Sequence, residues 1–127
     1  MKKITLTILA LGFVALVPKP VSAQMMPTAA EGRAVSFTAT VVDMSCKSVY
    51  NLSGDDHRMC AQACFDQGIP LALLGEDGTM YLPVTLVMGS ERGDKDLRGH
   101  AEHTVQVTGK VIERAGLNTI LIESIKM

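Results

Sequence analysis

The stretch VQVTGKVIERAGLNTILIESI, residues 105–125, carries the clearest structural signal in this chain. Apolar and polar residues alternate on both sides of Ala115-Gly116, as in two half-buried β-strands joined by a turn. Gly109 interrupts the first of these strands, and a glycine inside a strand often marks a bulge or a bend at a barrel corner. The stretch therefore predicts a β-hairpin that belongs to a barrel-like sheet.

Three more strands are expected upstream of this hairpin. Residues 35–41 alternate between apolar and hydroxyl side chains, as in a half-buried strand, and this strand is expected to end near Asp43. Residues 71–74 and 79–84 flank an Asp-Gly pair at 77–78, and this pair is a strong signal for a tight turn between apolar runs. Residues 86–102 are rich in charge and glycine, which favours a loop with at most one short helical turn.

The segment between the first two strands is expected to contain a loop and one short helix. Turn-forming residues predict the loop over 44–56. The helix is expected over 56–67, because an aspartate can cap its start and Gly68-Ile-Pro70 ends it.

Five strands with one helical insert predict a mainly β fold, namely a small, partly open, five-stranded OB-like barrel with a short helix between strands 1 and 2. The loop between the first two strands is one of the places where barrels of this kind bind ligands. A small β-sandwich or roll built from the same strands is the alternative.

The inserted segment also holds every cysteine of the chain. Cys46 is followed by His57-Arg-Met-Cys60-Ala-Gln-Ala-Cys64, so His57, Cys60 and Cys64 are spaced at i, i+3 and i+7. On an α-helix these positions share one face, and Cys46 is close enough for a loop to bring it back. Cysteine and histidine are ligands for borderline and soft metal ions. The cluster therefore predicts a Cys3His metal site.

Zinc is the first candidate for this site, because Cys3His is a common donor set for structural zinc. Copper(I) is the second, since thiolates favour it and the thioethers of Met44 and Met59 are nearby in the sequence. Met59 is nevertheless expected to point away from the ligand face. Asp43 either orients a ligand from outside the metal shell or is an ordinary aspartate at the end of a strand. His100 and His103 are interpreted as surface residues.

Two other interpretations of the cysteines stay open. A disulfide from Cys46 to Cys60 or Cys64 would leave one free thiol, as an odd cysteine count requires, and would suit a protein-interaction module. Alternatively, His57 could lower the pKa of a redox-active thiol. A thioredoxin-like activity has little support because the chain lacks a Cys-x-x-Cys motif. Enzymatic function is therefore less favoured than metal binding.

The first 23 residues have the pattern of a signal peptide. Lys2 and Lys3 precede the apolar run 4–17, and Val21-Ser-Ala23 is a small-residue cleavage site. The expected organisation is a signal peptide (1–23), a flexible mature N-terminus (24–33) and one OB-like domain (34–127). A periplasmic or secreted location follows, where oxidising conditions make disulfides a serious alternative.

Charge narrows the range of partners. Removing residues 1–23 leaves 104 residues with 9 basic and 13 acidic side chains, a formal net charge of −4. Such a balance does not indicate binding to nucleic acid or to an anionic membrane surface. The expected partner is a metal ion, and no feature of the sequence identifies a protein partner.

Four segments together resemble a group of small, largely uncharacterised exported bacterial proteins with OB-like domains. They are Thr40-Val-Val-Asp-Met-Ser-Cys46, His57-x2-Cys60-Ala-x2-Cys64, Gly68-Ile-Pro-Leu-Ala-Leu-Leu-Gly-Glu-Asp-Gly78 and Val105-Gln-Val-Thr-Gly-Lys110. The resemblance covers most of residues 35–125, and its most specific part is the Cys…His-x2-Cys-x3-Cys spacing. It implies an OB-like fold and a shared site at the three cysteines and His57, and it implies no activity.

Overall fold

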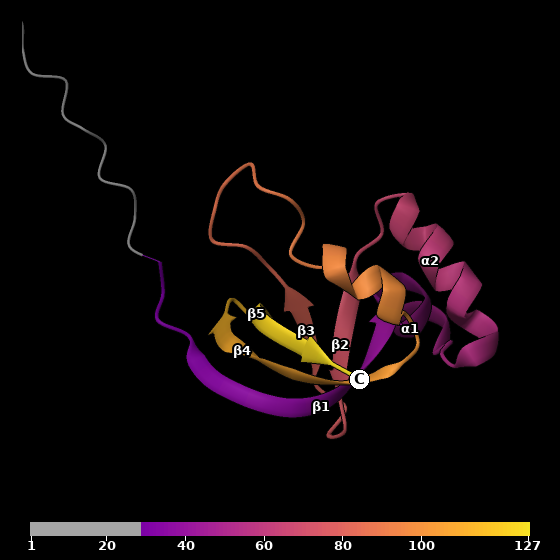
Figure 1. Ribbon diagram of the computed structural model, residues 1–127, viewed down its shortest axis with the longest axis horizontal. Helices are drawn as coiled ribbons and strands as arrows, with labels where there is room; N and C mark the ends of the chain where they lie inside the picture. The colour runs from indigo at the N-terminus through magenta and orange to yellow at the C-terminus, as the bar shows by residue number, and fades with distance from the viewer. Residues whose placement is uncertain (1–28) are drawn as a thin grey trace, which may run out of the picture.

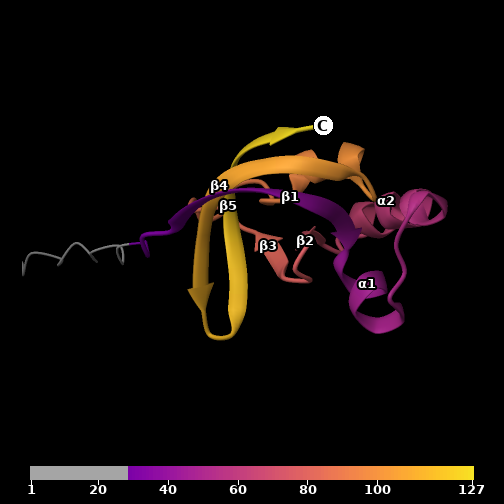
Figure 2. The same ribbon diagram turned by 90° about the horizontal axis from the view of Figure 1, so that it is seen from below.

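The computed structural model describes residues 29–127. The expected signal peptide (1–23) lies outside the described residues, as do residues 24–28 of the expected N-terminal segment 24–33. The described chain folds into a β-barrel with helices gathered at one end (Figure 1). Seen from below, the chain enters at the opposite end from these helices (Figure 2).

The five strands form a closed barrel in the order β1-β2-β3-β5-β4. Neighbouring strands are antiparallel except β3 and β5, which pair in parallel. This topology confirms the predicted five-stranded OB-like barrel and excludes a sandwich or roll. The strands are β1 (Arg33–Asp43), β2 (Leu71–Gly75), β3 (Met80–Pro83), β4 (Thr104–Arg114) and β5 (Leu117–Lys126).

A partly open barrel was expected, but the barrel is closed, because β1 is long enough to pair with two neighbouring strands. Its residues 33–40 pair with β4, and its residues 39–43 pair with β2. Closure pairs the strand edges that a partly open barrel would leave free.

The β4–β5 hairpin forms as its alternating pattern predicts. Val105, Val107 and Val111 of β4 are buried, as is Ile120 of β5. The register between the two strands shifts between Thr108 and Gly109, so the predicted irregularity at this glycine is confirmed. A shift of this kind bends a strand and increases its twist, which helps the sheet to close.

The insert between β1 and β2 has three helical pieces: α1 (Met44–Tyr50), the 3-10 turn η1 (Asp55–His57) and α2 (Arg58–Asp66). The prediction of a continuous loop over 44–56 is wrong for α1. Asp43 caps this helix by accepting a hydrogen bond from the Cys46 amide at 2.6 Å, and Asn51 ends it in the left-handed conformation. Both are recognised capping signals, and they outweigh the weak helix propensity of the residues between them.

The connection from β3 to β4 is anchored by an ion pair between a buried carboxylate and a more exposed guanidinium group. Asp94 is 3% exposed, accepts a hydrogen bond from the Leu71 amide and pairs with Arg92. Arg92 also donates to the carbonyl oxygens of Phe65 and Ile69 and lies over the Phe65 ring. These contacts fix the end of α2 against the connection. The one short helical turn allowed by the prediction for residues 86–102 is present as η2 (Lys95–His100).

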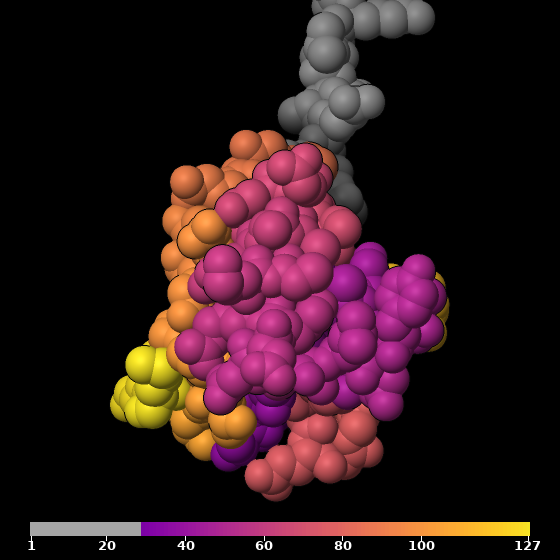
Figure 3. Space-filling model, turned by 90° about the vertical axis from the view of Figure 1, so that its right-hand side faces the viewer, coloured from indigo at the N-terminus to yellow at the C-terminus, as the bar shows by residue number. Residues whose placement is uncertain are grey.

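The apolar core fills the barrel and extends under the helical insert. Ala61 of α2 and Leu97 of η2 are fully buried against strand residues such as Leu71 and Val107. Viewed from the helical end, the insert covers much of the surface (Figure 3). Within residues 29–127, no helix has both the length and the apolar character needed to cross a membrane.

Candidate metal centre

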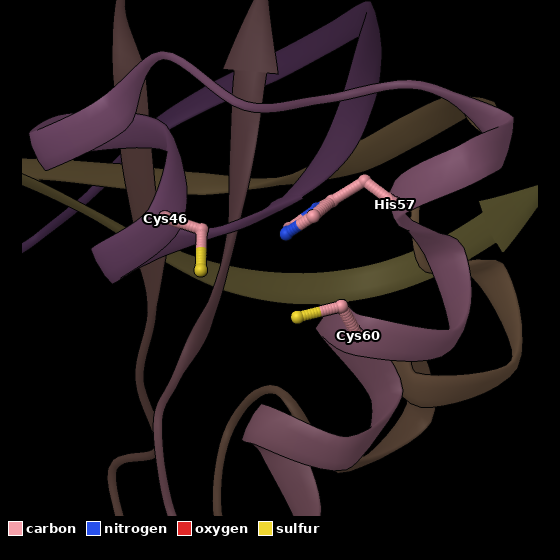
Figure 4. A group of neighbouring side chains, drawn as sticks. All are labelled: Cys46, His57 and Cys60. Carbon is pink, nitrogen blue, oxygen red and sulfur yellow. The ribbon is translucent and has the colours of Figure 1, made fainter.

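The four predicted donors lie on the helical insert at one end of the barrel. Cys46 is in the first turn of α1, His57 is the last residue of η1, and Cys60 and Cys64 are on α2. Figure 4 shows the sulfur atoms of Cys46 and Cys60 and the imidazole of His57 converging on one space between α1 and α2. Cys46, which is 11 residues before His57 in the sequence, is brought there by α1.

Two groups of three potential ligands share the Cys46 thiol. In the first, the donor atoms of Cys46, His57 and Cys60 lie within 4.8 Å of one another; we call this the His57 triad. In the second, Sγ of Cys46, Sγ of Cys64 and a carboxylate oxygen of Asp43 lie within the same distance; we call this the Asp43 triad. Each predicted donor belongs to a triad, but the described residues do not bring all four into one such group.

His57 is oriented by a buried carboxylate. Its Nδ1 lies 2.9 Å from Oε1 of Glu102, and the side chains of His57 and Glu102 are 10% and 0% exposed. Because the carboxylate accepts the Nδ1 proton, the neutral ring carries its lone pair on Nε2. Nε2 is buried and has no hydrogen-bond partner. A metal-binding histidine typically has this arrangement, with one nitrogen held by a carboxylate and the other free to bind the ion.

Glu102 is a candidate site residue that the sequence did not indicate. It has a positive φ of 63°, a conformation that is costly for a residue with a side chain. Its amide donates to the Val41 carbonyl oxygen at 2.7 Å, and its carboxylate also accepts from the Gly54 amide at 2.8 Å. The strained backbone thus aims the carboxylate at the insert, 45 residues away from His57 in sequence.

Asp43 has one occupied and one free carboxylate oxygen. Its Oδ1 accepts the Cys46 amide hydrogen bond that caps α1. The whole residue is buried, and its Oδ2 has no hydrogen-bond partner. A buried carboxylate oxygen without a hydrogen bond is energetically costly. The structure therefore places Asp43 against the cysteines, in a position to act as a ligand or to hold one.

The other residues considered from the sequence lie outside both triads. Met59 is 83% exposed, in agreement with the expectation that it points away. His100 and His103 are half-buried instead of lying freely on the surface, and the Nδ1 atom of each is buried without a hydrogen-bond partner. A surface hollow of about 630 Å³ between β5 and the β3–β4 connection contains none of the four predicted donors.

All three cysteines are free thiols. Burial, followed by the nearby Asp43 carboxylate, raises the pKa of Cys46 above its usual value. Burial and Asp43 also raise the pKa of Cys64, to about 12. Since a reactive cysteine needs a lowered pKa, these two thiols do not have the property that the redox interpretation requires.

Slow alkylation of Cys46 and Cys64 in the metal-free protein is therefore expected at pH 7. A raised pKa keeps a thiol protonated, so its reaction with iodoacetamide should be slow at pH 7 and should still accelerate with pH beyond the ordinary cysteine range. The Cys60→Ser variant isolates these two thiols, and mass spectrometry of quenched samples follows them. Urea-unfolded protein provides the control rate. Faster alkylation of the folded variant than of the unfolded one would show that these thiols are activated.

Comparison with known protein families, curated proteins and solved structures finds no match for this chain. The resemblance to small exported bacterial proteins therefore stays a prediction. Arguments about function rest on the geometry of the two triads.

Proposed function

We propose that this is an exported metal-binding protein that holds a zinc ion at the helical end of its barrel. The first position is the His57 triad, with the thiolates of Cys46 and Cys60 and the neutral imidazole of His57 as ligands. Cys64, the fourth predicted donor, lies outside this triad but shares a group with Cys46 in the Asp43 triad. The function is metal handling in the periplasm or outside the cell, without catalysis.

The observation that carries this proposal is the buried, unpartnered Nε2 of His57. The Glu102 carboxylate fixes the other ring nitrogen, and two sulfur atoms lie within 4.8 Å of the ring donor. In a tetrahedral zinc site, ligand atoms lie about 3.5–3.8 Å apart. Shifts on the order of 1 Å would therefore bring the three donors onto one ion.

Zinc is favoured over copper(I) by the oxygen and nitrogen atoms around the thiols. Imidazole and carboxylate are both ordinary zinc ligands, whereas copper(I) prefers sulfur. Met59 is 83% exposed, as expected for a side chain that points away from the ligand face. Copper remains the second candidate because the three cysteines alone would suit it.

Reversible metal handling is favoured over a purely structural role. None of the three cysteines belongs to the hydrophobic core, which closes through the strands, Ala61 and Leu97. Cys60 is exposed, so the His57 triad is open to exchange with the solvent. Chelation is therefore expected to lower the melting temperature, since the ion binds only the folded state, while the far-ultraviolet circular dichroism spectrum is retained.

Elemental analysis combined with thiol titration tests the proposal. Protein purified from the periplasm without chelators should contain zinc, and its cysteines should become titratable after chelation under anaerobic conditions. A metal-free protein that binds no added zinc and has one titratable thiol would instead support the disulfide alternative. Either bridge from Cys46 would remove the donor that the two triads share.

The Glu102→Gln variant is expected to bind zinc about 10–100-fold more weakly than the wild type, as is typical when the partner of a metal-binding histidine is lost. Glutamine keeps the size of the side chain but no longer presents a charged acceptor to Nδ1. Competition with a chromophoric chelator measures the affinity. Glu76→Gln, at an exposed turn position, is the matched control. Equal affinities of the two variants would mean that Glu102 does not orient the ligand.

Export is the second part of the proposal, and it rests on the pattern of residues 1–23. Expression of the full chain in a bacterium with a periplasm should yield a mature protein that begins at Gln24. Intact-mass analysis of the periplasmic fraction measures this directly. Recovery of the uncut chain from the cytoplasm alone would argue against export and would leave the metal-binding proposal unaffected.

A further inference from the structure

Each triad includes a residue with one buried polar atom that has no hydrogen-bond partner. In the His57 triad it is Nε2 of His57, and in the Asp43 triad it is Oδ2 of Asp43. Buried polar atoms are nearly always satisfied, so two unpaired atoms in groups that share one thiol need an explanation. A single ion on His57, Cys46 and Cys60 would account for the first atom and leave the second without a partner.

We infer that the site binds two zinc ions and that the Cys46 thiolate bridges them. The inference extends the proposed function and rests on it. One ion takes His57 and Cys60 as its other ligands from this chain, and the second takes Asp43 and Cys64. A thiolate sulfur has several lone pairs and can bind two ions at once, and Cys46 belongs to both triads.

Separation along the chain supports two ions over one. His57 and Cys64 are seven residues apart, a rise of about 10.5 Å along a helix. This spacing places them at different levels of the insert, and they do not share a triad. Cys46 of α1 faces the space between these levels, within 4.8 Å of both sets of donors.

Charge balance supports the same conclusion. When metal is bound, the three thiolates and the Asp43 carboxylate carry four negative charges, which two Zn²⁺ ions neutralise. One Zn²⁺ on the His57 triad would leave the fully buried Asp43 carboxylate without a cation, and an uncompensated buried charge is strongly unfavourable. No ion pair of Asp43 with a lysine or arginine is present among the described residues.

Native mass spectrometry of the reduced protein during titration with zinc chloride tests the inference. Two ions per chain are expected for the wild type and one for Asp43→Asn or Cys64→Ser, with the first ion still bound. Asparagine retains an oxygen to cap α1, so the Asp43 variant keeps the helix. Cys64→Ser provides a second, nearly isosteric variant, and circular dichroism verifies the fold of both.

The stoichiometry separates the inference from the proposed function. One ion in the wild type and none in Cys64→Ser would indicate a single four-ligand site and overturn the two-ion inference alone. No ion in the wild type would overturn both. For the bridge itself, ¹¹³Cd NMR of the cadmium-loaded protein should show two resonances coupled through the shared sulfur. Two uncoupled resonances would indicate separate ions without a bridging Cys46.

Discussion

Replacing Cys46 by serine is expected to abolish zinc binding at physiological zinc concentrations, with affinity falling roughly 10²–10³-fold at each triad. A four-ligand zinc site binds its ion with about 10–16 kcal/mol. The expected loss in affinity corresponds to about one quarter of this binding free energy. Serine does not deprotonate to replace the thiolate, and Cys46 is the one residue common to both triads. Competition with a chromophoric chelator under reducing conditions measures the loss.

Three comparisons make this result specific. Ser45→Ala changes an exposed neighbour on the same helix and should bind zinc like the wild type. Cys60→Ser and Cys64→Ser should each weaken the binding of one ion and leave the binding of the other unchanged. If the cysteines instead served a disulfide, Cys46→Ser would remove both candidate bridges and lower stability by about 2–4 kcal/mol without changing metal content. Wild-type zinc affinity in the Cys46 variant would exclude the proposed centre.

The strands were predictable because their signals are local. Alternation of side chains predicts β1, β4 and β5, and Asp77-Gly78 predicts the turn that joins β2 to β3. Gly109 indicated an irregularity, and the register shift lies beside it. The helix α1 was not predicted because its interior residues are weak helix formers. Its caps, Asp43 and Asn51, are nevertheless residue types that favour helix ends.

The candidate site was only half predictable, since its organisation depends on contacts between distant segments. The spacing of His57, Cys60 and Cys64 indicated shared ligation from one helix. In the structure, Cys46 joins His57 and Cys60 in one group and Cys64 in another, because α1 turns its thiol toward both. Glu102 could not be recognised, as its role comes from a left-handed backbone conformation and from burial, neither of which has a local sequence signature.

The barrel that carries the site depends on the absence of a side chain at Gly109. A Cβ atom at this position would overlap the backbone carbonyl oxygen of Leu121 and lie 3.2 Å from its carbonyl carbon. Gly109 is held on its other side by pairing with Val35 of β1, so neither neighbour can withdraw without opening the barrel. Tight backbone contacts of this kind cannot be relieved by a change of rotamer.

Gly109→Ala is therefore expected to destabilise the fold by about 3 kcal/mol or more, at the upper end of overpacking substitutions. For a domain of this size, each kcal/mol corresponds to about 4–8 °C, so the melting temperature should fall by about 12 °C or more. Thermal unfolding followed by circular dichroism measures it. Gly99→Ala is the matched control, because a Cβ there meets no atom within 4 Å, and its stability should stay near that of the wild type. If the Gly109 variant had the same melting temperature as the wild type, the close approach of Gly109 to the Leu121 backbone would be excluded. The barrel also positions the site, because β1 ends at Asp43 and β4 begins shortly after Glu102. A destabilised Gly109 variant should therefore bind zinc normally below its melting temperature and lose the ion as it unfolds.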